Sequence, residues 1–219
     1  MSSSEELIQR YLDKILVVNE TMNLTRITGG ERARLLHIED SLSGLQELKE
    51  APEGLYGDLG SGGGFPGVPL ALASGRKTVL VDSVKKKMSA VQGIIDSMGL
   101  NDQISTYGGR IEELSEDQKE SFSALTARAL TALPSLLELA SPLLQKRGHL
   151  ICYKAPLDEE LEQALRIQDK LGFKMKSKRE FILSDNETKR CILVFEKIHR
   201  PSLKLPRRVG LAQKKPLLS

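Results

Sequence analysis

The sequence predicts an α/β fold: a mostly parallel sheet with helices between its strands, an antiparallel hairpin at its end, and an N-terminal helical extension. Three observations predict it. The first fifty residues carry apolar side chains at helical spacing, the middle of the chain alternates short apolar runs with amphipathic stretches, and the last third holds two strand-like runs with no helix between them. The 219 residues, of which 40% are hydrophobic, suffice for one such domain.

The N-terminal region is expected to be helical. Apolar residues recur at helical spacing over residues 5–19 and again over residues 31–49, so each range should form one amphipathic helix. The character of the sequence changes after Ala51-Pro52. We therefore expect residues 1–50 to be an N-terminal helical extension, residues 51–198 the sheet domain and residues 199–219 a basic C-terminal tail.

Five apolar runs are expected to be parallel strands, because a helical stretch follows each of them. They cover residues 55–59, 78–82, 103–107, 123–127 and 149–154. Residues 173–183 and 189–198 are joined by SDNET alone and should pair as an antiparallel hairpin. A Rossmann-like sheet of seven strands closed in this way is typical of S-adenosylmethionine-dependent methyltransferases, by analogy of fold alone.

The charge is unevenly distributed along the chain. The formal net charge is +3, but residues 174–219 hold 13 Lys and Arg against 4 Asp and Glu. The tail contains no acid, which favours attraction to phosphate. Its candidate RNA contacts are Arg200, Lys204, Arg207, Arg208, Lys214 and Lys215.

Two other readings of the tail stay open. It is either a solvated segment or a segment in which Pro206, Leu217 and Leu218 pack on the core. Because no cofactor signal lies in the tail, removing residues 199–219 is expected to leave cofactor binding intact.

Several classes of protein are excluded by composition. No apolar run approaches the roughly 18 residues that a membrane span needs, and the N-terminus has no leader pattern, so a cytoplasmic location is expected. Cys152 and Cys191 make no disulfide framework and should be small buried side chains in strands. No His and Cys cluster offers a metal site. Aromatic residues make up only 4% of the chain and Trp is absent, which disfavours a stacking platform for single-stranded nucleic acid.

A glycine-rich loop is the most specific local signal. The first expected strand runs into GDLGSGGGFPG, in which Gly62, Gly64 and Gly67 match G-x-G-x-x-G. Glycines let a ligand lie against the backbone at the start of the next helix. Asp58 would receive a ligand ammonium but repel a pyrophosphate, and Pro66 lacks the amide that a pyrophosphate would use. Both features favour S-adenosylmethionine over a dinucleotide, although a nicotinamide or flavin cofactor and a purely structural turn stay open.

Two further segments complete the expected cofactor site. Asp82 ends the second expected strand, where a ribose-binding carboxylate belongs, although it would also suit a helix cap. Residues 109–114, GRIEEL, follow the third strand, where backbone groups and an apolar side chain could hold an adenine.

The chain as a whole resembles the RsmG (GidB) family of bacterial small-subunit rRNA guanine-N7 methyltransferases. The resemblance rests on the order and spacing of NLT at 23–25, HIEDSL at 37–42, GDLGSGGGFPGVPLALA, VDSVKKK, GRIEEL, TARAL with LPSLLELASPLL, Tyr153-Lys154 and a closing LPRRVG…KKPL. It implies an S-adenosylmethionine-dependent rRNA methyltransferase. It also implies cofactor contacts at Gly60, Phe65, Ile111, Glu112 and Arg128.

The chain departs from the family pattern at three places. Gly63 is often Ala in the family, and the tail differs from the usual P-R-K-x-G-T-P. The family often has an acid at the position of Ser123. We therefore expect that the serine leaves the active-site edge without a carboxylate that relatives have.

The implied reaction needs no general base, because guanine N7 has an in-plane lone pair and no proton. The enzyme is expected to supply alignment, exclusion of water and stabilisation of developing positive charge. Because N7 faces the deep major groove of A-form RNA, the target should be unstacked or single-stranded.

Four side chains are candidates for positioning the guanine. Arg128 ends the fourth expected strand and could bind the cofactor carboxylate or guanine O6, or form a surface salt bridge. Lys154 ends the fifth and could reach an RNA phosphate. His37 and Asp40 lie three residues apart and could fix their helix over the pocket, or form a local pair.

The expected partner is 16S rRNA or the small ribosomal subunit; no membrane, metal or oligomer is required. Two other functions stay open at this point, a nicotinamide-dependent oxidoreductase and a non-catalytic RNA-binding assembly factor.

Overall fold

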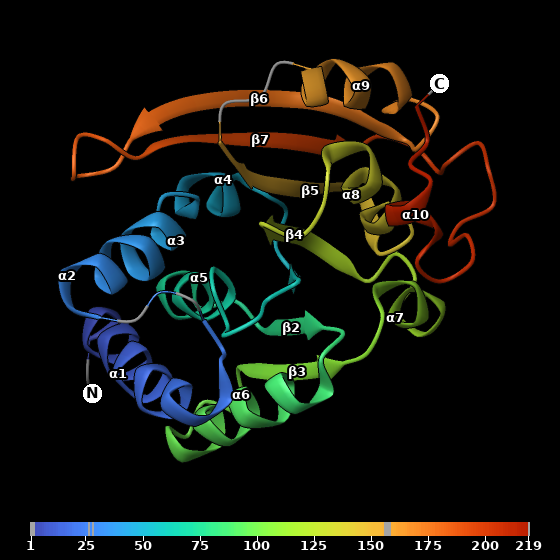
Figure 1. Ribbon diagram of the computed structural model, residues 1–219. Helices are drawn as coiled ribbons and strands as arrows, with labels where there is room; N and C mark the ends of the chain where they lie inside the picture. Colours follow the sequence, from blue (N-terminus) through green and yellow to red (C-terminus); the bar gives the residue numbers. More distant parts are fainter. Residues whose placement is uncertain (1–2, 26, 28, 156–158, 219) are drawn as a thin grey trace.

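The computed structural model describes residues 3–25, 27, 29–155 and 159–218. In this part of the chain seven strands form one sheet in the order β3-β2-β1-β4-β5-β7-β6 (Figure 1). All neighbours are parallel except β7, which pairs antiparallel with both β5 and β6. The strands are β1 Leu55–Leu59, β2 Thr78–Asp82, β3 Ile104–Gly108, β4 Phe122–Arg128, β5 Leu144–Lys154, β6 Phe173–Ile182 and β7 Lys189–Lys197. The predicted fold class is confirmed.

Helices cover both faces of the sheet (Figure 1). On one face lie α1 (Ser4–Met22), α5 (Gly67–Ser74) and α6 (Lys85–Ser97), whose apolar side chains share one core cluster. On the other face α7 (Ile111–Asp117), α8 (Leu133–Ala140), α9 (Glu159–Ile167) and α10 (Leu211–Lys214) enclose a second cluster. Because both faces are covered, the central strands are buried almost throughout, and a strand side chain reaches one face or the other by simple alternation.

The first helix is an integral part of one face. A capping box between Ser3 and Glu6 starts α1, and the helix then buries Tyr11, Leu12 and Ile15 against the cluster that contains α5 and α6. Ile15 has no exposed surface. Burial of this helical stripe supplies the stability that an isolated helix lacks in water.

The second expected helix, residues 31–49, is not continuous. Four short elements replace it: α2 (Gly30–Ala33), a π-helical turn η1 (Arg34–Glu39), α3 (Asp40–Leu42) and α4 (Leu45–Glu50). The chain turns at Gly44, where a Cβ would lie 2.1 Å from the hydroxyl oxygen of Tyr153 on β5. That same hydroxyl donates a hydrogen bond of 2.6 Å to the Ser41 carbonyl. The contact with the sheet therefore determines where the helix breaks.

The C-terminal tail lies on the face opposite α1. Ala212 is buried, and Leu205 and Leu217 are half-buried against the second cluster, whereas Leu218 is exposed. Arg200 pairs with Glu120, and Arg207 pairs with the buried Glu138. The tail thus packs on the sheet domain. The packing interpretation is confirmed for Pro206 and Leu217, which are half-buried, and is wrong for Leu218.

Some smaller expectations can also be compared with the structure. Cys152 and Cys191 are buried free thiols on β5 and β7, as expected. Among the described residues, no helix has both the length and the apolarity to cross a membrane.

Candidate cofactor and substrate pocket

Asp58 holds the glycine-rich loop in place from below. One carboxylate oxygen accepts hydrogen bonds from the Ser61 hydroxyl at 2.6 Å and the Gly67 amide at 3.0 Å, and the other accepts one from the Thr126 hydroxyl at 2.7 Å. The side chain has no exposed surface. Burial raises its pKa to about 6, while the bonds from Ser61 and Thr126 act in the opposite direction. These contacts make Asp58 the organiser of the loop, and its contact with a ligand ammonium stays a prediction.

Glycine stands at each position of the loop for a different physical reason. A Cβ on Gly64 would lie 2.1 Å from the Tyr11 hydroxyl oxygen, so Gly64 is required by the packing of α1. Gly62 has a φ of +56°, and a Cβ there would meet nothing within 4 Å. Gly62 therefore borders open space where a ligand can approach the backbone. A methyl group on Gly63 would make ordinary contact with the Leu24 carbonyl oxygen at 3.6 Å, which explains why Ala suits this position.

Asp82 joins the end of β2 to the loop. One carboxylate oxygen accepts the Gly62 amide at 3.0 Å, and the other accepts the Val84 amide at 2.9 Å just before α6. The carboxylate therefore joins the loop to the residue before α6. It does not cap the helix, because Val84 is the N-cap residue of α6 and, among the described residues, this helix start has no side-chain capping hydrogen bond, so the capping interpretation is not supported. Asp82 also lines the pocket beside the loop, where its role in binding a ribose stays a prediction.

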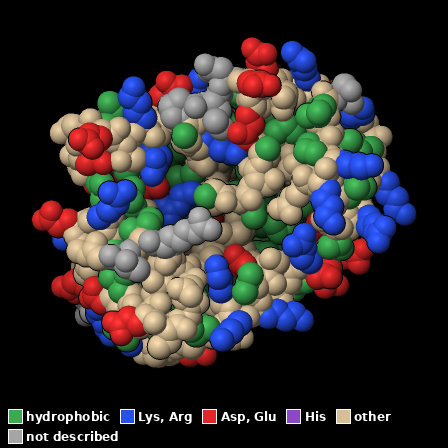
Figure 2. All heavy atoms as spheres, in the orientation of Figure 1, with side chains coloured by type: hydrophobic (Ala, Val, Ile, Leu, Met, Phe, Trp, Pro, Cys, Tyr) green, Lys and Arg blue, Asp and Glu red, His purple; other side chains and the backbone are tan. Residues whose placement is uncertain are grey.

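A pocket of about 540 Å³ opens at the carboxyl edge of the sheet, next to the loop. Figure 2 shows a hollow on this face, with Lys and Arg side chains in and around it. Eight predicted site residues line the pocket together: His37, Asp40, Gly60, Gly62, Phe65, Asp82, Arg128 and Lys154. Asp58 and Gly64 lie behind the loop and do not line it.

Two arginines share one buried carboxylate at the rim of this pocket. The Arg128 guanidinium donates to Asp40 Oδ2 at 2.9 Å and to the Leu36 carbonyl at 3.1 Å. Arg190 Nε donates to Asp40 Oδ1 at 2.9 Å. The Asp40 side chain is 3% exposed, so this is a half-buried cluster and not a surface salt bridge. Asp40 fixes the direction of both guanidiniums at the sheet edge.

His37 lies on the same helical segment and packs flat on Phe65, with ring centroids 4.4 Å apart. Its Nε2 is 2.9 Å from the Thr25 hydroxyl. Burial, followed by the positive charge of Arg128, lowers the pKa of His37 to about 4. The imidazole is therefore neutral near pH 7 and forms part of the apolar wall beside the loop.

Lys154 reaches the pocket from the opposite face of the sheet. Its Nζ donates to Glu160 at 2.5 Å and to the Thr131 carbonyl at 2.8 Å. Its side chain is 13% exposed, so much of its charge is already paired within the chain. A contact between Lys154 and an RNA phosphate stays a prediction.

The expected adenine site is a separate, much smaller cavity. Ile111 and Glu112, at the start of α7, line a cavity of about 60 Å³ that shares Gly60 and Asp82 with the larger pocket. Glu112 is buried, and its Oε1 accepts the Gly210 amide of the tail at 2.6 Å. The two cavities flank the end of β2. The part of the site expected to hold the adenine and the part expected to hold the methyl donor therefore lie on either side of Asp82.

One expectation about the active-site edge is wrong. Ser123 lies near the beginning of β4, at the end of the strand opposite to Arg128. Its hydroxyl donates to the Leu55 carbonyl at 3.0 Å and accepts from Arg76 at 3.1 Å. Ser123 belongs to a hydrogen-bond network at the other end of the sheet, so a serine there does not take a carboxylate away from the pocket.

Sequence reasoning did not assign several polar residues of these cavities to the site. Thr25, Lys87 and Arg190 line the larger pocket, and Gln213 lines the smaller one. Arg190 could have been found, because the second strand of an antiparallel hairpin begins at the edge where the parallel strands end. Gln213 carried no signal, since its position depends on how the tail folds back.

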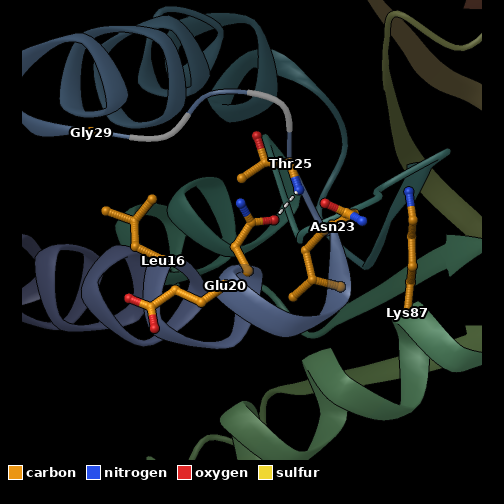
Figure 3. A pocket seen from close by; sticks show the side chains of 8 residues that line it. Leu16, Glu20, Asn23, Thr25, Gly29 and Lys87 are labelled. Carbon is orange, nitrogen blue, oxygen red and sulfur yellow. Dashed lines mark hydrogen bonds between the residues drawn. The ribbon is translucent and has the colours of Figure 1, made fainter.

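A further hollow, of about 900 Å³, adjoins the pocket of about 540 Å³ (Figure 3). Leu16, Asn19 and Glu20 line it from α1, and Thr25 and Lys87 border both hollows. The Asn19 side chain accepts the Thr25 amide at 2.7 Å and so fixes the wall between them. Elsewhere, the described residues contain no group of three His, Cys, Asp or Glu side chains that could hold a metal ion.

The candidate RNA contacts of the tail lie outside both cavities. Arg200 and Arg207 are engaged with Glu120 and Glu138, whereas Lys204, Arg208, Lys214 and Lys215 are exposed. Figure 2 shows Lys and Arg side chains gathered over the tail. RNA binding by these residues stays a prediction.

Solved methyltransferases share this fold. An O-methyltransferase from Bacillus cereus in complex with SAH is 16% identical and aligns with a TM-score of 0.60, covering 85% of this chain and 90% of its own. A geranyl diphosphate methyltransferase in complex with GPP and sinefungin is 11% identical, with a TM-score of 0.62 and coverage of 89% and 99%. At these identities the likeness concerns the fold alone.

Sequence comparison is more specific. The family model "GidB: rRNA small subunit methyltransferase G" matches residues 4–193. Curated proteins named ribosomal RNA small subunit methyltransferase G are similar over nearly the whole chain. That of Alkaliphilus metalliredigens is 35% identical and covers 94% of this chain and 88% of its own. That of Fervidobacterium nodosum is 33% identical, with coverage of 97% and 98%.

The resemblance and the predicted class of enzyme, an S-adenosylmethionine-dependent methyltransferase, are thereby confirmed, and the chain belongs to the GidB family of rRNA small subunit methyltransferases G.

Proposed function

We propose that this protein methylates guanine N7 in 16S rRNA, with S-adenosylmethionine bound along the carboxyl edge of the sheet. Membership of the family supports the substrate class and argues against the nicotinamide-dependent alternative. A cytoplasmic location follows from the proposed ribosomal substrate. The observation that carries the proposal is a single pocket in which the open backbone at Gly62 faces the Arg128–Asp40–Arg190 cluster.

The residues present fit the cofactor. The open space at Gly62 is a cradle that a side chain would fill, and Asp82 offers a carboxylate at the end of β2. Gly60, Gly62 and Phe65 would border the methionine side, Asp82 would bind the ribose, and Ile111 and Glu112 would border the adenine. When bound, the cofactor supplies an electrophilic methyl group on a sulfonium.

The chemistry asked of the protein is positioning. Guanine N7 carries no proton, so the neutral His37 is consistent with a site that needs no general base. Arg128, held by Asp40, would donate to guanine O6 or to the cofactor carboxylate, and Arg190 offers a second guanidinium at the same edge. The stacked Phe65 and His37 exclude water on one side.

RNA would be bound mainly through its backbone. The exposed tail cations Lys204, Arg208, Lys214 and Lys215 would contact phosphates, and Lys154 would do so at the pocket after exchanging Glu160 for the ligand. Since N7 of paired guanine is inaccessible in A-form RNA, the target guanine is unstacked or single-stranded.

Labelled methyl transfer tests the function. With labelled S-adenosylmethionine, small-subunit RNA should become labelled, and transcripts in which 7-deazaguanosine replaces guanosine should not, because carbon replaces N7. Label in the 7-deaza transcript would contradict N7 as the target. No label in either RNA would favour the non-catalytic assembly factor.

Two loop variants test the cofactor site by calorimetry with S-adenosylhomocysteine. Gly62→Val places a branched side chain in the open space and should abolish binding, whereas Gly63→Ala adds a methyl group with ordinary contacts and should not. Unchanged binding in a folded Gly62→Val variant would show that the loop is not the cofactor site.

A further inference from the structure

The C-terminal tail forms one wall of the small cavity beside Ile111 and Glu112. Gln213 of α10 lines this cavity directly. The Gly210 amide donates to Glu112 Oε1 at 2.6 Å, and the Ser135 hydroxyl of α8 donates to the Ala212 carbonyl at 2.7 Å. The tail is therefore hydrogen-bonded to α7 and α8, on two sides of the cavity.

Arg207 closes this tail segment on itself. Its Nε and Nη2 donate to the two carboxylate oxygens of Glu138 at 2.7 and 2.6 Å, and Nη2 also donates to the Lys215 carbonyl at 2.9 Å. Glu138 is 3% exposed, so the pair is well shielded from solvent. One guanidinium thus ties both ends of the segment 207–215 to α8.

The cavity is too small for its expected ligand while the tail is in this position. Its volume is about 60 Å³. Pockets that bind small molecules measure roughly 300 to 1,000 Å³, and a single water occupies about 30 Å³. The neighbouring pocket is about 540 Å³ and shares Gly60 and Asp82, so only the end covered by the tail is closed.

The apolar contacts of the tail are modest. In the segment 207–215 Ala212 is buried, while Leu205 and Leu217, which flank the segment, are half-buried. The polar contacts can be exchanged for contacts with water at a small net cost in free energy, which is larger for the charged pair. Such a segment can open locally while the sheet stays folded.

We propose that residues 207–215 are a latch over the adenine end of the cofactor site, and that release of Arg207 from Glu138 admits the nucleoside. This inference rests on the proposed function of the pocket. It reverses the expectation that the tail is dispensable for cofactor binding, because Gln213 lines the cavity and Gly210 is hydrogen-bonded to Glu112, which also lines it. Arg207 and Gly210 are positioning residues, which act through Glu138 and Glu112.

Binding kinetics of S-adenosylhomocysteine test the latch. The double variant Glu138→Gln/Arg207→Gln removes the charge-assisted bonds without leaving a buried unpaired carboxylate. Because the closed latch competes with the nucleoside, association should become about tenfold faster in the double variant, while dissociation from the already open complex should stay within about twofold of the wild type. Arg200→Gln is the matched control, since Arg200 forms the same kind of pair with Glu120 at an exposed place and lines neither cavity. Its rates should stay within about twofold of the wild type.

Hydrogen exchange of the amides of residues 208–214 gives a second readout. S-adenosylhomocysteine should speed exchange of these amides in the wild type, because the bound nucleoside holds the latch open. In the double variant exchange should already be fast without ligand, while thermal melting confirms that both proteins are folded. Wild-type rates and protection in a folded double variant would overturn the latch and leave the function standing. Failure of the wild type to bind S-adenosylhomocysteine would overturn the proposed cofactor site, and the latch with it.

Discussion

The two ends of the chain are attached to the sheet by different means. Helix α1 is anchored by fully buried apolar side chains such as Leu12 and Ile15, and it touches the glycine loop through the Tyr11 hydroxyl. The tail, on the opposite face, is anchored by the Arg207–Glu138 pair, by single hydrogen bonds and by smaller apolar contacts, in which Ala212 is buried and Leu205 and Leu217 are half-buried. Apolar burial cannot be replaced by water, whereas polar contacts can. The N-terminus is therefore built into the core, whereas the C-terminus is held mainly by contacts that water can replace, as the proposed latch requires.

The largest expected effect concerns stability. Ile15→Ala removes a side chain with no exposed surface and should lower the free energy of unfolding by about 2 to 5 kcal/mol. Leu217→Ala in the tail removes a half-buried side chain and should cost about 1 kcal/mol. Urea denaturation measures both. Equal losses in the free energy of unfolding for the two variants would contradict the conclusion that the two ends of the chain are anchored differently.

The pH dependence of stability should reveal the buried histidine of the N-terminal segment. The pKa of His37 is lowered to about 4, so between about pH 6.5 and 4 the unfolded chain binds more protons than the folded protein. The free energy of unfolding therefore falls as the pH falls through this window, by roughly 3 kcal/mol at most. Asp58, with its pKa raised to about 6, acts in the opposite direction because the folded protein keeps that proton.

The His37 contribution is isolated by comparison with His37→Gln. In urea denaturation between pH 7 and 4, the wild type should lose more stability than the variant. Parallel pH profiles would show that the histidine is not buried in its neutral form.

The tail cations are expected to affect RNA binding more than stability. Replacing Lys204, Arg208, Lys214 and Lys215 by Gln removes exposed charges that pair with no acid in the described part of the chain. If about half contact phosphate, the slope of log affinity against log salt should fall by about 1.4 to 1.8, using roughly 0.7 to 0.9 per phosphate. Filter binding over a salt series measures it, and an unchanged slope would contradict the proposed RNA contact.

The smallest effect is expected at the link between α1 and the loop. Tyr11 donates to the Gly63 carbonyl at 3.0 Å, and Tyr11→Phe removes this bond while keeping the ring. We expect a loss of about 1 kcal/mol in the free energy of unfolding and weaker S-adenosylhomocysteine binding, because the loop loses one of its supports. Thermal melting and calorimetry would measure the two. A stability loss with unchanged affinity would show that α1 supports the fold but not the site.

The sequence by itself determined the strands and their edge. Each of the seven predicted runs overlaps an observed strand, because a sheet covered on both faces demands short continuous apolar runs and leaves little freedom in their placement. The alternation of strands and helices determined that β1, β2 and β4 end together. For that reason Gly62, Asp82 and Arg128, read as separate signals, meet in one pocket.

Only the tertiary structure decided which partner each polar group takes. Asp58 lies near the end of a strand, where the sequence predicts a ligand-binding carboxylate. In the structure its oxygens accept hydrogen bonds from Ser61, Gly67 and Thr126 instead. The predicted helix over residues 31–49 breaks at Gly44 because Tyr153, more than a hundred residues later, lies there. Arg190 likewise donates to Asp40, and Gly210 to Glu112, although about a hundred or more residues separate the partners along the chain. Propensity and periodicity act over a few residues, whereas hydrogen-bond partners are chosen among whatever the packed core brings within 3 Å.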